Sequence, residues 1–427
     1  MRSLDIEILM KKLPNIAFYI SDKRHFDYFR NLLLALCEMG NEPVLILNDT
    51  RGLYGGKALP VGYVDEMKEL AGESGFTYVI SSESLRKKER FKLIVSTFAY
   101  YYKIPFGAVR LKSLLFYYLS TAILKIPLLK AVLHRFTGIQ KRITASAAQI
   151  TPGRNWVWPE QMHANQSVFF PKGLDISEQS PDKAIRELPD LFFCHGPYDQ
   201  AIIQKNTGKP VIPIGYPRYD GLSRNREEER SRIVEEFGLN PEQPLVTWLP
   251  TFAKHGRNIS EWLEQFRKLS DTVNVILRPH PKLMDEQSRD FYSHLETSGA
   301  VLDHVAQRNM TDLYGASDFV CCDYGGTIFS ALYTKTPLLL LDLSDHKTIA
   351  VTRNRSSDIR VRETLFHLTA EEAEERGGLQ TLLNDQVFWE AQKVVQKNVR
   401  DLYFGKISIG ESSHVAAKQL IKWAGSI

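Results

Sequence analysis

The chain has 427 residues, of which 43% are hydrophobic and 24% charged, and its formal net charge is +4. This length exceeds a single ordinary hydrophobic core and indicates two domains of about 200 residues each. The four cysteines do not have metal-ligand spacing, and residues 1–14 lack the apolar core of a secretory signal. These features argue against a secreted, disulfide-stabilised protein and indicate a reduced cytosolic compartment.

Short apolar runs alternate with helical periodicity in the first part of the chain. A helix is predicted at residues 26–39, closed by Gly40. Strands are predicted at residues 15–20, 43–47, 77–80 and 91–95. This alternation is typical of a parallel sheet covered by helices.

The segment that follows is strongly basic. Residues 90–159 contain eleven Lys and Arg and no Asp or Glu, so the rest of the chain is net acidic. Its apolar run at 114–124 is too short to span a bilayer, which takes about 20 residues. We favour a basic amphipathic helix that lies on an anionic membrane surface, which would place the protein on the inner face of the cell membrane. The alternative is a pair of core helices with a solvated basic rim.

After a polar stretch at 178–183 the alternating pattern starts again. Strands are predicted at residues 191–194, 211–214, 245–249, 273–277, 319–322 and 338–341, and the last two helices at 388–403 and 412–424. The predicted fold is α/β, with two doubly wound Rossmann-like domains that face a cleft and with helices at the C-terminus. We expect an N-terminal domain at 1–185 and a C-terminal domain at 186–427, with the last helix able to pack back on the first domain.

Two motifs follow predicted strands of the second domain. Arg-Pro-His-Pro occupies residues 278–281, and Asp-Tyr-Gly-Gly-Thr occupies residues 323–327. The carboxyl ends of parallel strands are where open α/β sheets bind ligands. Arginine and histidine donate hydrogen bonds to phosphates, and glycines allow backbone amides to approach an anion at a helix start. Together the motifs predict a nucleotide-diphosphate site in which Arg278 and His280 act on the phosphates.

These motifs occur with three others in a known order. Gly-Tyr-Pro-Arg-Tyr-Asp at 215–220, Leu-Pro-Thr-Phe at 249–252 and Gly-Glu-Ser-Ser at 410–413 complete a series that resembles the CDP-glycerol glycerophosphotransferases, the teichoic-acid and capsule polymerases. The resemblance implies a GT-B architecture, peripheral membrane association and transfer of a polyol phosphate from a CDP-linked donor, without a metal or another cofactor. The donor-binding residues that it implies, beyond the Arg-Pro-His-Pro motif, are Asp323, Gly325, Gly326, Thr327, Ser317, Thr251 and Arg218.

The sequence departs from the family at three places. Lys172 stands where the family has the histidine that acts as base on the acceptor hydroxyl. The turn after Asp-Tyr is Gly325-Gly326 instead of Ser-Ser, and the arginine after Pro-Thr-Trp is missing, with Lys254 and His255 nearby. The donor site is therefore expected to resemble the family more closely than the acceptor site does.

A base would remove the proton of the attacking alcohol and typically contributes about 10²–10⁴-fold to the rate. The candidates are His163, His195, Asp175 and Lys172, and we favour His195 by its chemistry although its family column is not catalytic. His25 follows the first predicted strand and is a further candidate for contact with the acceptor.

Two other classes of function stay open. The chain fits a GT-B glycosyltransferase or epimerase that uses a nucleotide sugar, since no residue selects cytosine over uracil. It also fits a non-catalytic glycan- or membrane-binding relative. The expected partners are a CDP-polyol or another nucleotide-activated donor, a glycan or lipid-linked acceptor and an anionic membrane, with no nucleic acid.

Overall fold

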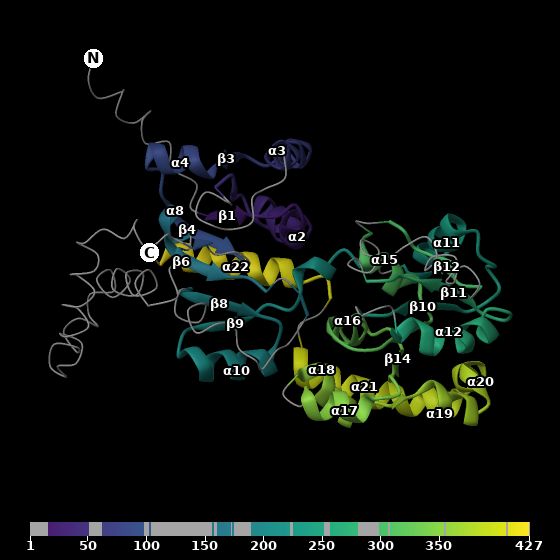
Figure 1. Ribbon diagram of the computed structural model, residues 1–427. Helices are drawn as coiled ribbons and strands as arrows, with labels where there is room; N and C mark the ends of the chain where they lie inside the picture. The colour runs from purple at the N-terminus through teal and green to yellow at the C-terminus, as the bar shows by residue number, and fades with distance from the viewer. Residues whose placement is uncertain are drawn as a thin grey trace, which may run out of the picture.

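The computed structural model describes residues 16–50, 62–97, 102–103, 156–157, 160–171, 173–174, 189–222, 225–251, 257–280, 299–305, 308–353, 356–406 and 409–426. Within these ranges the chain is an α/β protein with two separate parallel sheets, each covered by helices (Figure 1). The predicted fold class is therefore confirmed. Most of the basic interval, including the run at 114–124, lies outside the described residues.

The first sheet has seven parallel strands in the order β3-β2-β1-β4-β7-β8-β9. The strands are β1 (Ile16–Ile20), β2 (Val44–Leu47), β3 (Tyr78–Ile80), β4 (Phe91–Ser96), β7 (Ala164–Phe169), β8 (Leu191–Cys194) and β9 (Val211–Pro213). Nearly every residue of β1, β2, β4 and β8 is buried, as expected for parallel strands with helices on both faces. A separate antiparallel pair joins β5 (Tyr102–Lys103) to β6 (Trp156–Val157).

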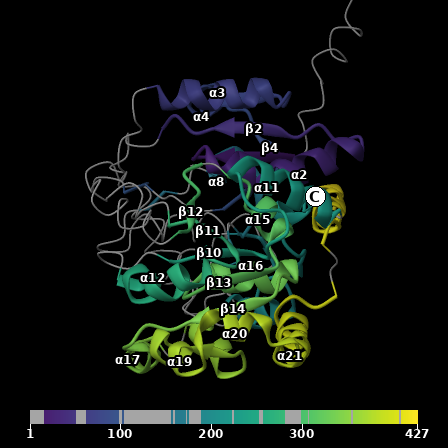
Figure 2. The same cartoon turned by 90° about the vertical axis from the view of Figure 1, so that its right-hand side faces the viewer.

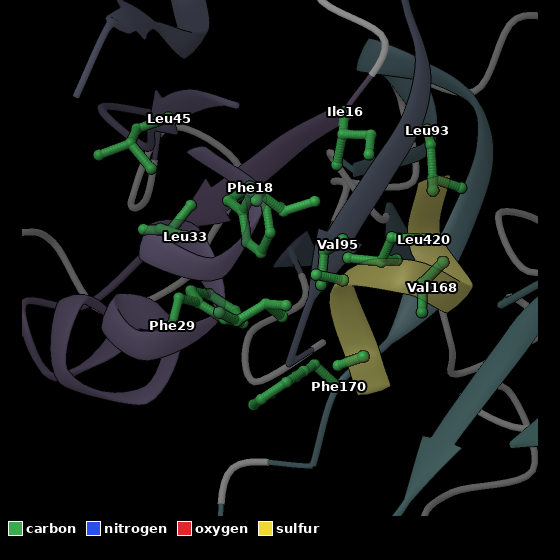
Figure 3. Packing of buried hydrophobic residues seen from close by; sticks show 14 of the residues in the cluster. Ile16, Phe18, Phe29, Leu33, Leu45, Leu93, Val95, Val168, Phe170 and Leu420 are labelled. Carbon is green, nitrogen blue, oxygen red and sulfur yellow. The ribbon is translucent and has the colours of Figure 1, made fainter. Parts of the chain in front are cut away.

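Helices connect the strands of this sheet. They are α2 (Arg24–Glu38), α3 (Tyr63–Glu73), α4 (Ser81–Lys87), α8 (Glu160–His163) and α10 (Pro197–Thr207). The last helix of the chain, α22 (Ser412–Gly425), also packs on this sheet, and Figure 1 shows it in yellow among the purple and teal elements of the N-terminal part. Figure 3 shows Leu420 of α22 in one cluster with Phe29 of α2 and Val95 of β4. The C-terminal helix thus completes the core of the first sheet.

The second sheet has six parallel strands in the order β12-β11-β10-β13-β14-β15. They are β10 (Leu245–Leu249), β11 (Asn274–Leu277), β12 (Val301–Leu302), β13 (Phe319–Cys322), β14 (Leu338–Leu341) and β15 (His367–Leu368). Its helices are α11 (Arg226–Phe237), α12 (Arg257–Leu269), α15 (Met310–Ala316), α16 (Gly326–Thr334), α17 (His346–Thr352), α18 (Ser357–Arg360), α19 (Ala370–Glu375), α20 (Gly378–Asn384) and α21 (Gln386–Phe404), with short 3₁₀ turns at η2 (Pro217–Tyr219) and η4 (Val361–Glu363).

The helices cover both faces of the second sheet. Ile233 of α11 and Leu313 of α15 pack on one face, whereas Trp262 of α12 and Leu379 of α20 pack on the other. Figures 1 and 2 both show α17, α19, α20 and α21 together beyond β14, towards the end of the strand order at which β15 lies. At the carboxyl end of β13, only three residues separate the strand from the start of α16.

The division into domains differs from the sequence-based boundary at residue 185. β8 pairs with β7 through the register Val168↔Leu191 and Phe169↔Phe192, and β9 pairs with β8, so both strands belong to the first sheet. The polar stretch at 178–183 suggested a linker, but strand pairing continues across it. The chain passes to the second sheet only after β9, through η2.

Among the described residues, no helix is long and apolar enough to cross a membrane.

Candidate active site

Three sequence motifs end at the carboxyl edge of the second sheet. In this sheet β10 lies between β11 and β13, with Leu249 of β10 opposite Cys322 of β13. Thr251 follows β10, His280 follows β11 and Asp323 follows β13, so all three lie at the ends of adjacent parallel strands. This is the edge at which open α/β sheets bind ligands.

Asp323 joins two of these strand ends. Its Oδ1 accepts hydrogen bonds from the backbone N–H groups of Thr251 (2.8 Å) and Tyr324 (2.7 Å), and its side chain is buried. The carboxylate therefore holds the β10 and β13 loops together. This contact explains the predicted importance of both Thr251 and Asp323, although it gives Asp323 a structural rather than a ligand-binding contact.

The glycine turn begins α16. Gly325 has φ +90°, a conformation that L side chains rarely adopt, and a Cβ atom there would lie 3.6 Å from Oγ1 of Thr251. Its backbone N–H donates to Oδ2 of Asp358 at 2.8 Å. Gly326 and Thr327 are the first two residues of the helix. The Gly325 amide, expected to bind the donor, is thus already paired, whereas Gly326 and Thr327 supply the amides of the first turn.

Arg278 lies in a buried ion pair at the end of β11. Its side chain is buried, and Nη1 donates to Oδ2 of Asp303 (2.6 Å) and to the carbonyl of Val305 (2.9 Å). The charge of Arg278 is therefore neutralised inside the protein, and the pair fixes the loop after β12. His280, two residues further along the loop, is half-buried at the same sheet edge.

A second buried arginine supports the glycine turn. Arg362 donates to Oδ1 of Asp342 and to the backbone carbonyl of Asp323, and its guanidinium lies 4.3 Å from the centre of the Tyr324 ring. Asp342 also pairs with Nδ1 of His367 at 2.6 Å. This network fixes the peptide between Asp323 and Tyr324, immediately before the turn.

Two predicted donor-binding residues lie elsewhere. Ser317 precedes β13, so the whole strand separates it from Asp323, and its fully buried hydroxyl is bonded to Thr247 and to the carbonyl of Leu313. Arg218 lies in η2, where it pairs with Asp27 of α2 at 2.5 Å and stacks on the ring of Tyr28. The charge of Arg218 thus links the second domain to α2 of the first sheet.

His195 follows β8 in the first sheet and is only 2% exposed. Its Nδ1 lies 2.6 Å from Oδ2 of Asp199, and its ring packs edge-on against Tyr216 at 5.5 Å. The neighbouring Gly196 is pressed against the backbone of Tyr403, so that no Cβ atom fits there. These contacts place His195 in the packing against Tyr216, away from the surface of the first sheet's edge, and its role as the base stays a prediction.

The carboxyl edge of the first sheet carries its own polar groups. Oγ1 of Thr97 lies 3.4 Å from Nε2 of His25, which is buried, and Ser96 donates to Oε1 of Glu160 at 2.7 Å. Burial raises the pKa of Glu160 to about 7, against the lowering effect of the Ser96 hydrogen bond. Oε2 of Glu160 has no hydrogen-bond partner among the described residues.

His163 is bonded within the first domain. Its Nε2 lies 2.8 Å from Oγ of Ser81, and its Nδ1 lies 3.3 Å from Oγ of Ser84. Burial, with a smaller effect of the Arg90 charge, lowers the pKa of His163 to about 4. A fully buried imidazole with both nitrogens bonded is a poor base for an external alcohol.

The side chains of Lys172, Asp175, Lys254 and His255 lie outside the described residues. Sequence reasoning missed Asp342, Asp358, Arg353 and Arg362, which surround the glycine turn. Asp342 directly follows β14, so the rule that found Asp323 would have found it as well. Asp358 and Arg362 come from a short helix and a 3₁₀ turn that follow no predicted strand.

Within the described ranges, no three His, Cys, Asp or Glu side chains come together as a set of metal ligands.

Residues 185–355 match the model of a protein family described as CDP-glycerol:poly(glycerophosphate) glycerophosphotransferase. A teichoic acid poly(glycerol phosphate) polymerase of Bacillus spizizenii is 28% identical over 141 residues, which are 31% of this chain and 34% of the relative. The match therefore spans about a third of the length of that relative.

Solved structures share the fold over nearly the whole chain. A variant of the wall teichoic acid polymerase TagF aligns with a TM-score of 0.59 and 12% identity, over 97% of this chain and 90% of that chain. HepE of Anabaena, in complex with UDP-glucose, aligns with a TM-score of 0.50 and 10% identity, over 96% of this chain and 99% of that chain. At these identities the likeness shows the fold alone, and this fold is GT-B-like.

Proposed function

We propose, from the match of residues 185–355 to the CDP-glycerol:poly(glycerophosphate) glycerophosphotransferase family model, that this chain transfers a polyol phosphate from a CDP-linked donor to a hydroxyl group and releases CMP. The observation that carries the proposal is the meeting of Thr251, His280 and the Gly325 turn at one sheet edge inside that segment. Glycerol phosphate is the first candidate for the transferred group, and ribitol phosphate is the second. The acceptor is a glycan or lipid-linked hydroxyl in the synthesis of a cell-surface polymer.

The reaction depends mainly on hydrogen-bond donors that the protein holds in fixed positions around the phosphates, and it needs no covalent intermediate with the protein. When an alcohol attacks the β-phosphorus of the donor, the bond from that phosphorus to the bridging oxygen breaks and negative charge grows on the departing CMP. His280 is suited to donate a hydrogen bond or a proton to that phosphate, and the first amides of α16 are suited to stabilise it. Arg278 acts by positioning, since its ion pair with Asp303 fixes the loops beside this edge.

We propose that these donors act without a catalytic metal. A histidine and the amides of a helix start together offset part of the charge of a diphosphate. The acceptor hydroxyl would approach from the first sheet, whose edge carries His25, Thr97 and Glu160. Lys172, in the column of the family base, stays a candidate for proton removal.

A donor screen tests the function. Release of the nucleotide is measured, as CMP from CDP-glycerol and CDP-ribitol and as UDP from UDP-glucose, each with a polyol-phosphate or glycan acceptor and in the presence and absence of EDTA. We expect CMP from a CDP-polyol, undiminished by EDTA. Release of UDP from UDP-glucose alone would instead support the second candidate, a GT-B glycosyltransferase. The similarity of the fold to that of HepE, whose structure contains UDP-glucose, is the reason for including this donor.

His280→Ala provides the matching variant. We expect turnover to fall at least about tenfold, because a general acid or fixed donor to the leaving phosphate typically contributes more than that. The thermal unfolding midpoint should stay unchanged, since the side chain is half-buried in a loop. Unchanged turnover would remove His280 from the mechanism. Asn41→Ala is the control variant, because Asn41 follows the C-terminal end of α2 in the first domain and its side chain bonds locally, to the carbonyl of Met39.

We also propose association with the inner face of the cell membrane. The support is the basic interval at residues 90–159, which holds eleven Lys and Arg and no acidic residue. Such a surface would bring a lipid-linked acceptor to the enzyme.

A further inference from the structure

Three arginines lie at or near the carboxyl edge of the second sheet, and two of them are buried in ion pairs. Arg278 is buried against Asp303, and Arg362 is buried against Asp342 and the carbonyl of Asp323. Each of these guanidinium groups sits beside a fixed carboxylate, so its charge is balanced within the fold. A donor phosphate could bind either arginine only if the buried ion pair of that arginine were broken.

Arg353, at the end of α17, differs in its exposure. Its side chain is 46% exposed, in contrast to 8% for Arg278 and 7% for Arg362. Nη2 of Arg353 donates to Oδ2 of Asp358 at 2.9 Å and to Oγ of Ser356 at 3.4 Å. Its guanidinium carbon lies 5.9 Å from the centre of the Tyr324 ring. Arg353 is thus a solvent-reaching cation beside the residue that precedes Gly325.

Asp358 connects this cation to the turn. The carboxylate is buried, and the same Oδ2 atom accepts from the backbone N–H of Gly325 at 2.8 Å. Its other oxygen accepts from the hydroxyl of Ser356. One carboxylate oxygen therefore holds a backbone amide and an arginine together. Backbone amides at a helix start and arginine side chains commonly donate hydrogen bonds to bound phosphates in proteins.

We propose that Arg353 binds the diphosphate of the nucleotide donor and gives up its bond to Asp358 when the donor is bound. This inference rests on the proposed function. Asp358 keeps the Gly325 turn in place through its bond to the amide, and in the donor-free protein its charge balances that of Arg353. A diphosphate carries more negative charge than one carboxylate and matches the planar guanidinium fork, so it competes for the exposed arginine. The sequence motifs had given this role to Arg278.

The exchange predicts opposite effects for the two partners. Removing Arg353 takes away an attractive charge, so Arg353→Ala should weaken CDP binding by about tenfold or more. Arg353→Lys should lie between this variant and the parent, because lysine keeps the charge but loses the fork. Asp358→Asn retains an oxygen for the Gly325 amide but removes the competing negative charge, so it should tighten CDP binding by about threefold.

Isothermal titration with CDP at low and moderate salt measures these affinities. Lys347→Ala is the matched control, because it removes one exposed positive charge from the same helix, and it should bind like the parent. The loss in Arg353→Ala should shrink as the salt concentration rises. If Arg353→Ala binds CDP like the parent, or if Asp358→Asn weakens binding as much as Arg353→Ala does, the pair is structural and the inference is overturned.

A second probe separates this inference from the proposed function. If the parent protein does not bind CDP at all, the proposed function fails, and the same four variants are titrated with inorganic pyrophosphate. A loss of pyrophosphate binding that is confined to the Arg353 variants then supports the phosphate site by itself. Equal pyrophosphate binding by the parent and Arg353→Ala overturns it.

Discussion

The partners of an arginine decide whether its charge can reach a ligand. Asp303 accepts from Arg278 at 2.6 Å and also lies 2.7 Å from Nε of Arg308, so one buried carboxylate is shared by two guanidinium groups. Loss of Arg278 would leave Asp303 with a cation still beside it. We therefore expect Arg278 to affect activity through the position of the loop that carries His280, rather than through contact with phosphate.

His163 predicts a pH dependence of stability. Its pKa is lowered from 6.5 to about 4 in the folded chain, mainly by burial. The unfolded chain takes up the proton below pH 6.5 while the folded chain does not, so the contribution of His163 is complete above pH 6.5 and is lost as the pH falls towards 4. The shift corresponds to at most about 3 kcal/mol. Replacement by Gln, which lacks a titrating group, should remove this loss.

Urea unfolding at pH 7 and pH 4.5 measures the effect. The free-energy difference between the parent and His163→Gln should be smaller at pH 4.5, and an equal difference at both pH values would show that the fold does not hold the ring neutral. Glu160→Gln supplies a control of opposite sign. The pKa of Glu160 is raised from 4.5 to about 7, so the contribution of Glu160 is present below pH 4.5 and is lost as the pH rises through 7.

At the scale of elements, Asp220 fixes the start of the last helix. Its carboxylate accepts from the backbone N–H groups of Gly410 (3.0 Å), Ser412 (3.2 Å) and Ser413 at the beginning of α22. Negative charge at a helix start satisfies amides that have no partner within the helix. Because α22 completes the core of the first sheet, this contact makes the order of the first domain depend on a residue between the domains.

Asp220→Ala should therefore lower the free energy of unfolding by about 2–3 kcal/mol, since it leaves several partly buried amides unpaired. Asp220→Asn keeps an oxygen acceptor and should lose less than half as much. Urea unfolding measures both, and limited proteolysis near residues 406–411 should cut the Ala variant faster. A loss below about 0.5 kcal/mol for Asp220→Ala would contradict this account of the cap.

Strands were more predictable than contacts. The apolar runs fixed the bounds of β8, β10, β13 and β14 without error, because a strand buried on both faces leaves a continuous apolar signature. The same signature does not say which sheet a strand joins, so β8 and β9 were assigned to the second domain. The site was predicted as far as strand ends define it, which includes His280 and the Gly325 turn. Asp358 and Arg353 approach that turn only through tertiary packing.

At the scale of the molecule, the two sheets are held together by several separate contacts. Arg218 pairs with Asp27, and Asn31 of α2 donates to the carbonyl of Pro217 at 2.9 Å. The backbone N–H of Tyr216 donates to the hydroxyl of Tyr333 on α16, whose first turn forms the candidate donor site. The segment between the sheets thus contacts both α2 of the first sheet and α16 of the second.

We predict that the chain binds anionic membranes, on the basis of the charge of its basic interval at residues 90–159. Four cations flank or interrupt the apolar stretches of the basic interval, and they are Lys112, Lys125, Lys130 and Arg135. Each basic residue close to an anionic surface contributes about 1 kcal/mol, so four of them should produce measurable binding to anionic vesicles at low salt. Binding should weaken as the ionic strength rises, because salt screens the attraction.

Changing all four residues to glutamate should abolish sedimentation with vesicles that contain phosphatidylglycerol. Hydrolysis of a soluble CDP-linked donor should stay nearly intact, because the candidate donor site lies on the second sheet. A control variant reverses four exposed charges of the described residues elsewhere in the chain, Lys87, Lys205, Lys347 and Lys418. This control changes the net charge equally, so its continued sedimentation would assign the effect to the basic interval. If the first variant sediments like the parent, the basic residues serve packing or a soluble polyanionic acceptor, and the enzyme must reach its acceptor without an anionic membrane surface.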